Sequence, residues 1–246
     1  MTQPISSHSE PWLARMVYPL GCRVVIPTFF GQVTVIGREH IPENGPVIVA
    51  PTHRSRWDGM MVPYAVGRWI SKRDLHYMVS ANEVSRGLQG WILRRMGAFP
   101  VDTERPQASS VSHSVELLLE NRMLVIFPEG GIYRDGTIHP LKRGVARIAV
   151  DVESRRSNSG MRILPIQIEY SNAFPTWGTN VRLNIGPAID VASYCGDSPR
   201  KSSQVLTQVL HDALGALAST SQQKCETALW PKGAEPQELR QQTAAN

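Results

Sequence analysis

Cysteine is scarce in this chain of 246 residues: Cys22, Cys195 and Cys225 lie far apart, and none belongs to a Cys-x-x-Cys pair. Such scattered cysteines exclude a disulfide scaffold and a structural zinc site, and they fit a reducing compartment. A glycine-rich dinucleotide loop, a Walker sequence, a Gly-x-Ser-x-Gly elbow and a metal-ligand cluster are also missing. These absences argue against a nucleotide-dependent enzyme, a serine esterase and a metal centre.

The sequence also lacks an uninterrupted apolar run of the length that a spanning helix needs. In the most apolar stretch, residues 11–37, Arg15, Pro19, Arg23 and Pro27 intervene before about 20 apolar residues accumulate. Aromatic residues beside the arginines predict a kinked helix lying in a membrane interface, namely Trp12, Tyr18, Phe29 and Phe30. The alternative is a helix that packs into the core and is broken at Pro19. We assign residues 1–31 to this interfacial segment.

Positive charge is in modest excess, with 26 Lys and Arg against 21 Asp and Glu, a net charge of +5 and a pI near 9.3. A basic chain attracts anionic partners such as nucleic acid, phosphorylated metabolites or an acidic lipid surface. The sequence contains no RNP motif, zinc-finger spacing or polybasic tail, and its arginines are spread along the chain. We therefore expect no nucleic acid partner.

Beyond the first segment, predicted strands and helices alternate, which is typical of an α/β domain. The strands are expected at Gln32–Ile36, Pro46–Ala50, Leu75–Val79, Met123–Phe127, Arg162–Tyr170 and Val181–Ile185. The helices are expected at Trp57–Trp69, Leu88–Arg95, Gln107–Asn121, Gly144–Glu153 and Ser202–Leu217. We assign residues 32–220 to this domain, and we predict a mobile polar tail over residues 221–246.

The clearest candidate for chemistry follows the predicted strand at residues 46–50, in the segment Pro51-Thr-His53-Arg-Ser-Arg-Trp-Asp58. A strand that ends in His53 places the imidazole at the carboxyl edge of a sheet, where α/β proteins hold their ligands. Across the junction between loop and helix, the Asp58 carboxylate can reach back to that ring. This contact would fix the imidazole tautomer, as a general base requires. A turn histidine next to a capping aspartate is the alternative.

A second strand, Met123–Phe127, also ends in polar residues, Pro128-Glu129-Gly130-Gly131. Two strands can therefore bring His53 and Glu129 to the same sheet edge. The glycine pair lets the backbone approach a ligand closely. Arg134 can donate a bidentate pair to a phosphate, and Lys142 precedes a predicted helix N-terminus that favours anions. A tight turn with solvated charges is the alternative.

Together with Gly97-Ala-Phe-Pro-Val-Asp102 and Leu164-Pro-Ile166, these segments match a four-block pattern in order and spacing. The chain resembles the 1-acyl-glycerol-3-phosphate acyltransferase (PlsC-like) family of glycerolipid acyltransferases, over roughly residues 32–190. The resemblance implies a mixed central sheet flanked by helices, and transfer of an acyl group from a thioester to a lipid hydroxyl. It also implies His53 as the base, Asp58 as the residue that orients it, and Glu129 as an organiser of the acceptor pocket. Gly130 and Gly131 would offer N–H groups to the oxyanion.

The implied reaction forms phosphatidic acid from 1-acyl-glycerol-3-phosphate. Its donor would be acyl-CoA or acyl carrier protein, without a metal or another cofactor. The partners would be membrane lipids, and the location would be the cytoplasmic face of a membrane. One alternative is an acyltransferase that acts on another lysolipid or a lipid alcohol, and another is a catalytically silent membrane-binding scaffold.

The chain departs from the family pattern where arginines are expected to hold the acceptor phosphate. Thr103 follows Asp102 in place of an arginine, and Gly131-Ile132 replace the usual Thr-Arg of the third block. Arg105, Arg134 and Lys142 are the expected substitutes.

Overall fold

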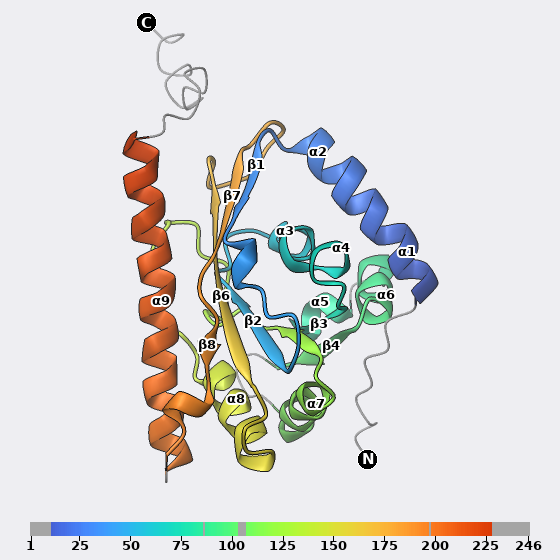
Figure 1. Ribbon diagram of the computed structural model, residues 1–246. Coiled ribbons are helices and arrows are strands. Elements are labelled where there is room, and N and C mark those ends of the chain that lie inside the picture. The colour runs from blue at the N-terminus through green and yellow to red at the C-terminus, as the bar shows by residue number, and fades with distance from the viewer. Residues whose placement is uncertain (1–10, 86, 103–106, 197, 228–246) are drawn as a thin grey trace, which may run out of the picture.

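The computed structural model describes residues 11–85, 87–102, 107–196 and 198–227. Its strands form one sheet (Figure 1). Their bounds are β1 Val33–Ile36, β2 Val47–Pro51, β3 Leu75–Ser80, β4 Ala98–Val101, β5 Met123–Val125, β6 Arg162–Tyr170, β7 Val181–Ile185 and β8 Ile189–Asp190. The order across the sheet is β1-β7-β6-β2-β5-β3-β4, and β8 pairs with β6.

The sheet is mixed, as predicted. β2 pairs in parallel with β5 and β6, and β3 pairs in parallel with β5 and β4. β7 runs antiparallel to β6, and β1 runs parallel to β7. Because β2, β5 and β6 are parallel neighbours, their carboxyl ends meet at one edge of the sheet, which positions the candidate site.

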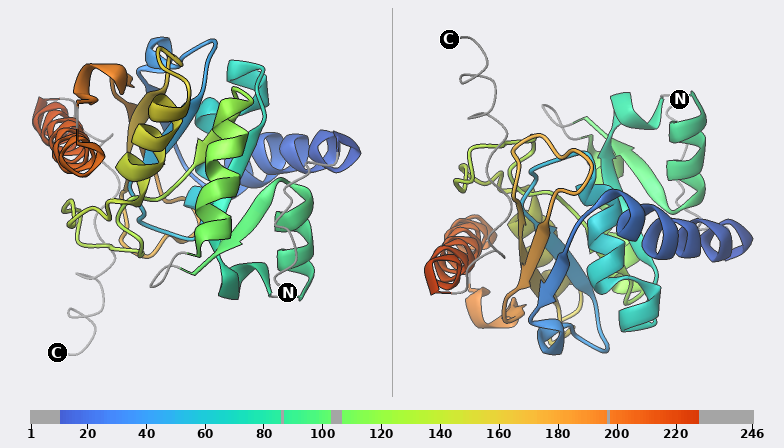
Figure 2. Two further views of the ribbon diagram at one scale, coloured as in Figure 1. Left: turned by 90° about the horizontal axis from the view of Figure 1, so that it is seen from below. Right: turned by 90° about the horizontal axis from the view of Figure 1, so that it is seen from above.

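Helices cover both faces of the sheet, on opposite sides in the views of Figures 1 and 2. One face carries α3 Asp58–Val66, α4 Arg68–Ser71 and the N-terminal helix, which consists of α1 Pro11–Pro19, the π-helical η1 Leu20–Val25 and α2 Ile26–Phe29. The other face carries α7 Ala108–Leu119, α8 Gly144–Arg155 and α9 Pro199–Thr227. The remaining helices are the 3₁₀ turns η2 Arg38–His40 and η3 Ala192–Tyr194, with α5 Ala81–Val84 and α6 Gly87–Arg95 next to β4.

The core has two layers because the central strands are buried on both faces. Along β2, Val47 and Val49 pack toward α3 and the N-terminal helix, whereas Ile48 and Ala50 pack toward α7, α8 and α9. All four are fully buried. The continuous apolar run at this strand therefore reflects its central position, which anchors the loop that carries His53.

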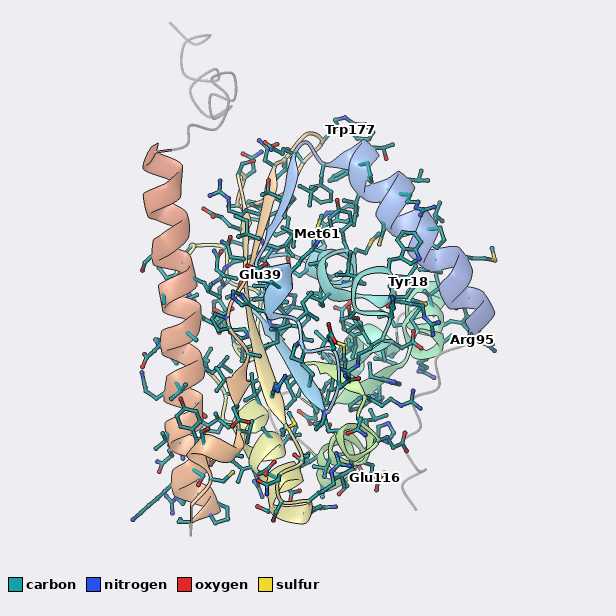
Figure 3. All side chains as sticks on the ribbon, in the orientation of Figure 1. Tyr18, Glu39, Met61, Arg95, Glu116 and Trp177 are labelled. Atoms are coloured by element: carbon teal, nitrogen blue, oxygen red, sulfur yellow. The ribbon has the colours of Figure 1, made fainter. Side chains whose placement is uncertain are left out.

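The N-terminal helix continues through Pro19 instead of breaking there. The wider π-helical turns of η1 follow the proline directly, and such turns accommodate a residue that lacks the backbone N–H donor. Tyr18 and Phe30 are buried against the domain, so they do not line an exposed interfacial face as expected. Figure 3 shows Tyr18 on the inner side of the helix. The side chains of Trp12 and Arg15 lie outside the described part of the chain.

Two predicted helices differ most from the structure. The helix expected at Trp57–Trp69 is divided at Gly67, whose ψ of −170° is extended, so α3 ends there and α4 begins. A Cβ at Gly67 would lie 2.4 Å from the Pro63 carbonyl oxygen, so this turn requires glycine. The last helix, expected to end at Leu217, continues to Thr227. Its final turns contain Gln, Ser and Thr, and adding residues to an existing helix costs little. The rest of the predicted tail, residues 228–246, lies outside the described residues.

Candidate active site

The chain reaches the site by extending the pairing between β2 and β6 one residue past β2. The Thr52 N–H donates to the Ile166 carbonyl oxygen at 2.9 Å, and the Ile168 N–H donates to the Thr52 hydroxyl at 2.9 Å. Thr52 is fully buried. His53 is therefore the first residue to leave the sheet, at the carboxyl edge where the sequence predicts it.

The predicted contact between His53 and Asp58 is present. The His53 Nδ1–H donates to Asp58 Oδ2 at 2.8 Å, across a turn that leads into α3. This bond assigns the proton to Nδ1, which leaves the Nε2 lone pair available to accept a proton. The His53 side chain keeps 20% of its surface exposed, whereas the Asp58 side chain is fully buried. The pair thus has the arrangement of a base and the carboxylate that orients it.

Several further donors stabilise the Asp58 carboxylate. The N–H groups of Arg54 and Ser55 donate to Oδ2 at 2.6 and 2.8 Å. The Tyr170 hydroxyl, from the end of β6, donates to Oδ1 at 2.6 Å. Asp58 is also the first residue of α3, and a helix N-terminus favours negative charge. Hydrogen bonds therefore reach both oxygens of this fully buried carboxylate, as a buried polar group requires.

Glu129 lies beneath the His53 loop, which confirms that two strands bring these residues to one edge. Its buried carboxylate accepts the His53 N–H at 2.9 Å and the His139 N–H at 3.1 Å. The Arg54 guanidinium donates to both carboxylate oxygens at 3.1 Å, and Arg54 is itself buried. In this position Glu129 holds the loop that carries His53 in place.

The backbone and the ring of His53 are also held by the loop after β5. The Tyr133 N–H donates to the His53 carbonyl oxygen at 2.9 Å, so both polar backbone atoms of His53 have partners. The Phe127 ring stacks on the imidazole, with 4.1 Å between ring centroids. The loop after β5 therefore constrains where the imidazole can point.

The two candidate oxyanion glycines differ in their surroundings. The Gly130 N–H donates to the Phe127 carbonyl oxygen at 3.2 Å, within a turn that requires its positive φ of 71°. A Cβ at Gly130 would lie 2.5 Å from Lys142 Cε, so the lysine side chain lies against this glycine. Lys142 is exposed, and its N–H donates to the Pro128 carbonyl oxygen at 2.8 Å. This leaves the Gly131 amide as the better candidate donor for an oxyanion.

Arg134 borders a cavity of about 220 Å³ between the end of β6, the loop at residues 134–136 and α9. Arg54 and Tyr170 also line this cavity, which therefore reaches the residue that bonds to Asp58. The Arg134 guanidinium carbon lies 4.7 Å from the centroid of the Phe174 ring. It forms no ion pair with any residue that the structure describes. Arg105, the other predicted arginine, lies outside the described residues.

Arg54 and Tyr170 are parts of this site that sequence patterns do not single out. Arg54 is one of two arginines that follow the histidine closely, and nothing in its spacing separates a buried cation from a solvated one. Tyr170 lies 112 residues from Asp58, so only the sheet topology reveals their contact. Burial and the nearby Asp58 charge raise the pKa of Tyr170 well above its ordinary value, which keeps the hydroxyl protonated.

Within the described residues, no group of three or more His, Cys, Asp or Glu side chains is placed to hold a metal ion. Likewise, no described helix is both long and apolar enough to cross a membrane.

Comparison with known proteins identifies the family. Residues 32–169, more than half of the chain, match the family model described as Acyltransferase. The chain belongs to this acyltransferase family. The match contains β2, β5, all of β6 but Tyr170, and the His53–Asp58 pair, so the family assignment and most of the candidate site coincide.

Curated relatives of this chain carry names that agree with the resemblance in its sequence motifs. The 1-acyl-sn-glycerol-3-phosphate acyltransferase of Bacillus subtilis is 34% identical over 125 residues, or 51% of this chain and 60% of that protein. The enzyme of that name from Streptococcus pneumoniae is 28% identical over 151 residues, covering 59% and 50%. The human alpha form is 33% identical over 128 residues, covering 50% and 42%. The chain thus spans about half the length of these relatives.

A solved structure confirms the fold. The crystal structure of the 1-acyl-sn-glycerophosphate (LPA) acyltransferase, PlsC, from Thermotoga maritima superimposes with a TM-score of 0.61. The alignment covers 89% of this chain and 81% of that one, at 21% sequence identity. The helix-flanked mixed sheet expected from the resemblance is therefore correct.

Proposed function

We propose that this chain transfers a fatty acyl group from an acyl thioester to the free hydroxyl of 1-acyl-glycerol-3-phosphate, forming phosphatidic acid. The observation that carries the proposal is the 2.8 Å contact between His53 Nδ1 and Asp58, at the sheet edge of a chain in the acyltransferase family. The names of the relatives supply the acceptor. The donor is acyl-CoA or acyl carrier protein.

In the proposed step, the lipid hydroxyl oxygen attacks the thioester carbonyl carbon while His53 Nε2 accepts the hydroxyl proton. The tetrahedral intermediate then collapses, the carbon–sulfur bond breaks, and the departing thiolate takes the proton from the imidazolium. The products are an ester and a free thiol, so atoms and charge balance. A thioester is already activated, so the protein needs a base and no covalent nucleophile. Such a base contributes about 10²–10⁴ in rate.

Developing charge on the thioester oxygen needs donors close to His53. We assign this role to the Gly131 amide, with Lys142 beside Gly130 as a nearby cation. Glu129 shapes the acceptor pocket indirectly, because its carboxylate holds the His53 N–H and the Arg54 guanidinium in place.

We assign the acceptor phosphate to the cavity that Arg134 borders. Its guanidinium is exposed and unpaired within the described chain, and Phe174 supports it from one side. The same cavity reaches Tyr170, whose hydroxyl bonds to the Asp58 carboxylate. An anion held by Arg134 would therefore lie on the side of the catalytic pair that faces β6.

Arg134→Ala tests this assignment. A charge-assisted hydrogen bond is worth about 1.5–3 kcal/mol, so kcat/KM for lysophosphatidate should fall roughly 10–150-fold. Hydrolysis of the donor by water should change little, because it needs His53 but no phosphate contact. Arg147→Ala, which removes an exposed arginine from α8, is the matched control. An equal loss with lysophosphatidate and with a phosphate-free lipid alcohol would remove Arg134 as the phosphate ligand.

The displaced arginines favour one second candidate, an acyltransferase for another lysolipid. Gly131 and Ile132 stand where the family pattern has Thr and Arg, and Arg134 approaches the pocket from two positions later. Because the cation assigned to the phosphate is displaced, a lysolipid other than lysophosphatidate is the alternative acceptor. A panel of lysolipids with and without headgroups, each assayed for thiol release, separates the two acceptors.

We further propose that the N-terminal helix docks this acyltransferase on the cytoplasmic face of a membrane. Met16, Leu20 and Val24 recur every four residues on its outer face and are 64%, 58% and 50% exposed. Trp177, 74% exposed, lies beside Phe29 at the far end of this helix (Figure 3). Residues 11–37 contain arginines but no Asp or Glu, which suits an anionic lipid surface.

The docking test uses point substitutions, because removing residues 1–30 would also remove the buried Ile26 and Phe30 from the core. A Met16→Ser, Leu20→Ser, Val24→Ser triple variant should bind anionic vesicles about 10²-fold more weakly. Each half-exposed side chain contributes about 1 kcal/mol on burial. Val205→Ser, an exposed apolar position on α9 across the sheet, is the control. Equal vesicle flotation of triple variant and control would move the docking surface elsewhere.

A further inference from the structure

The hydrogen bonds of Asp58 are unevenly divided between its two oxygens. Oδ2 accepts three, from the His53 ring and from the N–H groups of Arg54 and Ser55. Oδ1 accepts one, from the Tyr170 hydroxyl at 2.6 Å. Asp58 is fully buried, so solvent does not reach that oxygen in the structure. Among the described residues, the state of Oδ1 therefore depends on one side chain from a different strand.

We infer that Tyr170 is a positioning residue of the catalytic pair, which sets how firmly Asp58 holds the His53 proton. This inference rests on the proposed role of His53 as the base. By binding Oδ1, Tyr170 prevents rotation of the carboxylate and keeps Oδ2 directed at Nδ1. It also disperses part of the negative charge that would otherwise act on the imidazole alone.

The surroundings of Tyr170 suit this role. Its ring lies at the carboxyl end of β6 and packs against Phe30, with 6.2 Å between ring centroids. Phe30 in turn contacts Trp57, the residue before Asp58, at 5.2 Å between ring centroids. Phe30 therefore supports the Tyr170 ring and is itself supported by Trp57. The raised pKa of Tyr170 means that it remains a donor across the working pH range.

The groups that face Asp58 decide whether loss of the Tyr170 hydroxyl makes the His53 ring hold its proton more or less strongly. These are the His53 ring from the loop after β2, two backbone N–H groups of the same loop, and Tyr170 from β6. The Arg54 guanidinium points instead to Glu129. Without the hydroxyl, Oδ1 has no donor and the carboxylate attracts the imidazolium proton more strongly. His53 then remains protonated to higher pH, where it cannot act as a base.

Tyr170→Phe removes only the hydroxyl and is the test variant. We expect kcat for acyl transfer to fall about tenfold, KM for the acceptor to stay within about twofold, and the acid limb of the pH–rate profile to move up by about one unit. Tyr194→Phe removes a hydroxyl from η3, away from the site, and should change none of these values. In an Asp58→Asn background, Tyr and Phe at position 170 should give the same kcat and the same pH–rate profile, because Tyr170 acts through that carboxylate.

A readout that needs no turnover separates this inference from the proposed function. The ring of His53, assigned by NMR from the signal missing in His53→Gln, is titrated in the wild-type chain and in Tyr170→Phe. A titration midpoint that moves to higher pH supports the inference whether or not lysophosphatidate is the acceptor. An unchanged midpoint overturns it. If Tyr170→Phe raised KM for the acceptor and left kcat unchanged, the inference would also be overturned. Tyr170 would then be an acceptor ligand, since it borders the cavity.

Discussion

Glu129 offers a direct test of how the site is held together, because two roles for it predict different results. The family resemblance implies that it organises the acceptor pocket. In the structure its carboxylate is buried and occupied by Arg54, the His53 N–H and the His139 N–H. Glu129→Gln would place an amide N–H₂ against one of these backbone donors and leave the buried Arg54 guanidinium without its counter-ion. We therefore predict a loss of stability.

The magnitude follows from those contacts. Breaking one side of a buried ion pair costs about 3–5 kcal/mol. Arg54 keeps bonds to the carbonyl oxygens of Tyr133 and Thr137, which favours the lower end, about 3 kcal/mol. At about 2–4 °C per kcal/mol for a domain of this size, the Tm should fall by about 6–12 °C. A double variant with Arg54→Met should recover part of the loss, because the uncompensated charge is removed as well.

The assay is thermal and urea unfolding, with turnover measured well below the lower Tm. Glu153→Gln is the control, since Glu153 on α8 is also buried but accepts its bonds from Asn158 and Ser159 in the loop after that helix, away from the site. It should cost less than Glu129→Gln and leave turnover unchanged. If Glu129→Gln kept its stability within about 1 kcal/mol while kcat/KM fell a hundredfold or more, Glu129 would act on the substrate and not on the loop.

Three further predictions concern the scaffold and its pH dependence. Met61→Ala, in the core between α3 and the sheet, should lower the free energy of unfolding by about 2–5 kcal/mol in urea denaturation, because it leaves a cavity. A loss below about 1 kcal/mol would mean that neighbouring side chains fill that cavity. Gly37→Ala should destabilise by more than about 2 kcal/mol on the same measure, because φ is +85° and a Cβ would meet the Ile185 carbonyl oxygen at 2.0 Å. Burial lowers the pKa of His76, so the unfolded chain binds its proton more readily and stability should decrease as pH falls below about 6.5, less steeply in His76→Gln. Equal slopes for the two proteins between pH 7.5 and 5.5 would refute that assignment.

The parts of the fold that sequence predicts well are those in which one local pattern decides the outcome. β6 and β7 begin and end at the predicted residues, since each is a run of β-branched and large apolar side chains bounded by turn residues. β4 was not predicted, because Gly97 and Pro100 give its short segment the pattern of a turn. Pro100 is tolerated there because β4 is the edge strand, where a missing N–H donor breaks no ladder.

The same distinction holds in the site. His53 and Asp58 lie five residues apart, so their contact depends on one turn and is readable from their spacing. Glu129 at the same edge required only the order of two parallel strands. Arg54 and Tyr170 were not predicted, since their roles depend on which strand neighbours β2 and on which charges become buried. Neither property is encoded in a local spacing.

The central claim is that His53 removes the proton from a lysophosphatidate hydroxyl during acyl transfer. The most direct measurement is thiol release from oleoyl-CoA on addition of lysophosphatidate, compared between the wild-type chain and His53→Ala, with both shown to be folded by thermal unfolding. We expect phosphatidate to accumulate with the released thiol in a one-to-one ratio, and turnover to fall by about 10²–10⁴ in the variant. Near-normal turnover in His53→Ala would contradict the mechanism, and thiol release without phosphatidate would contradict the acceptor.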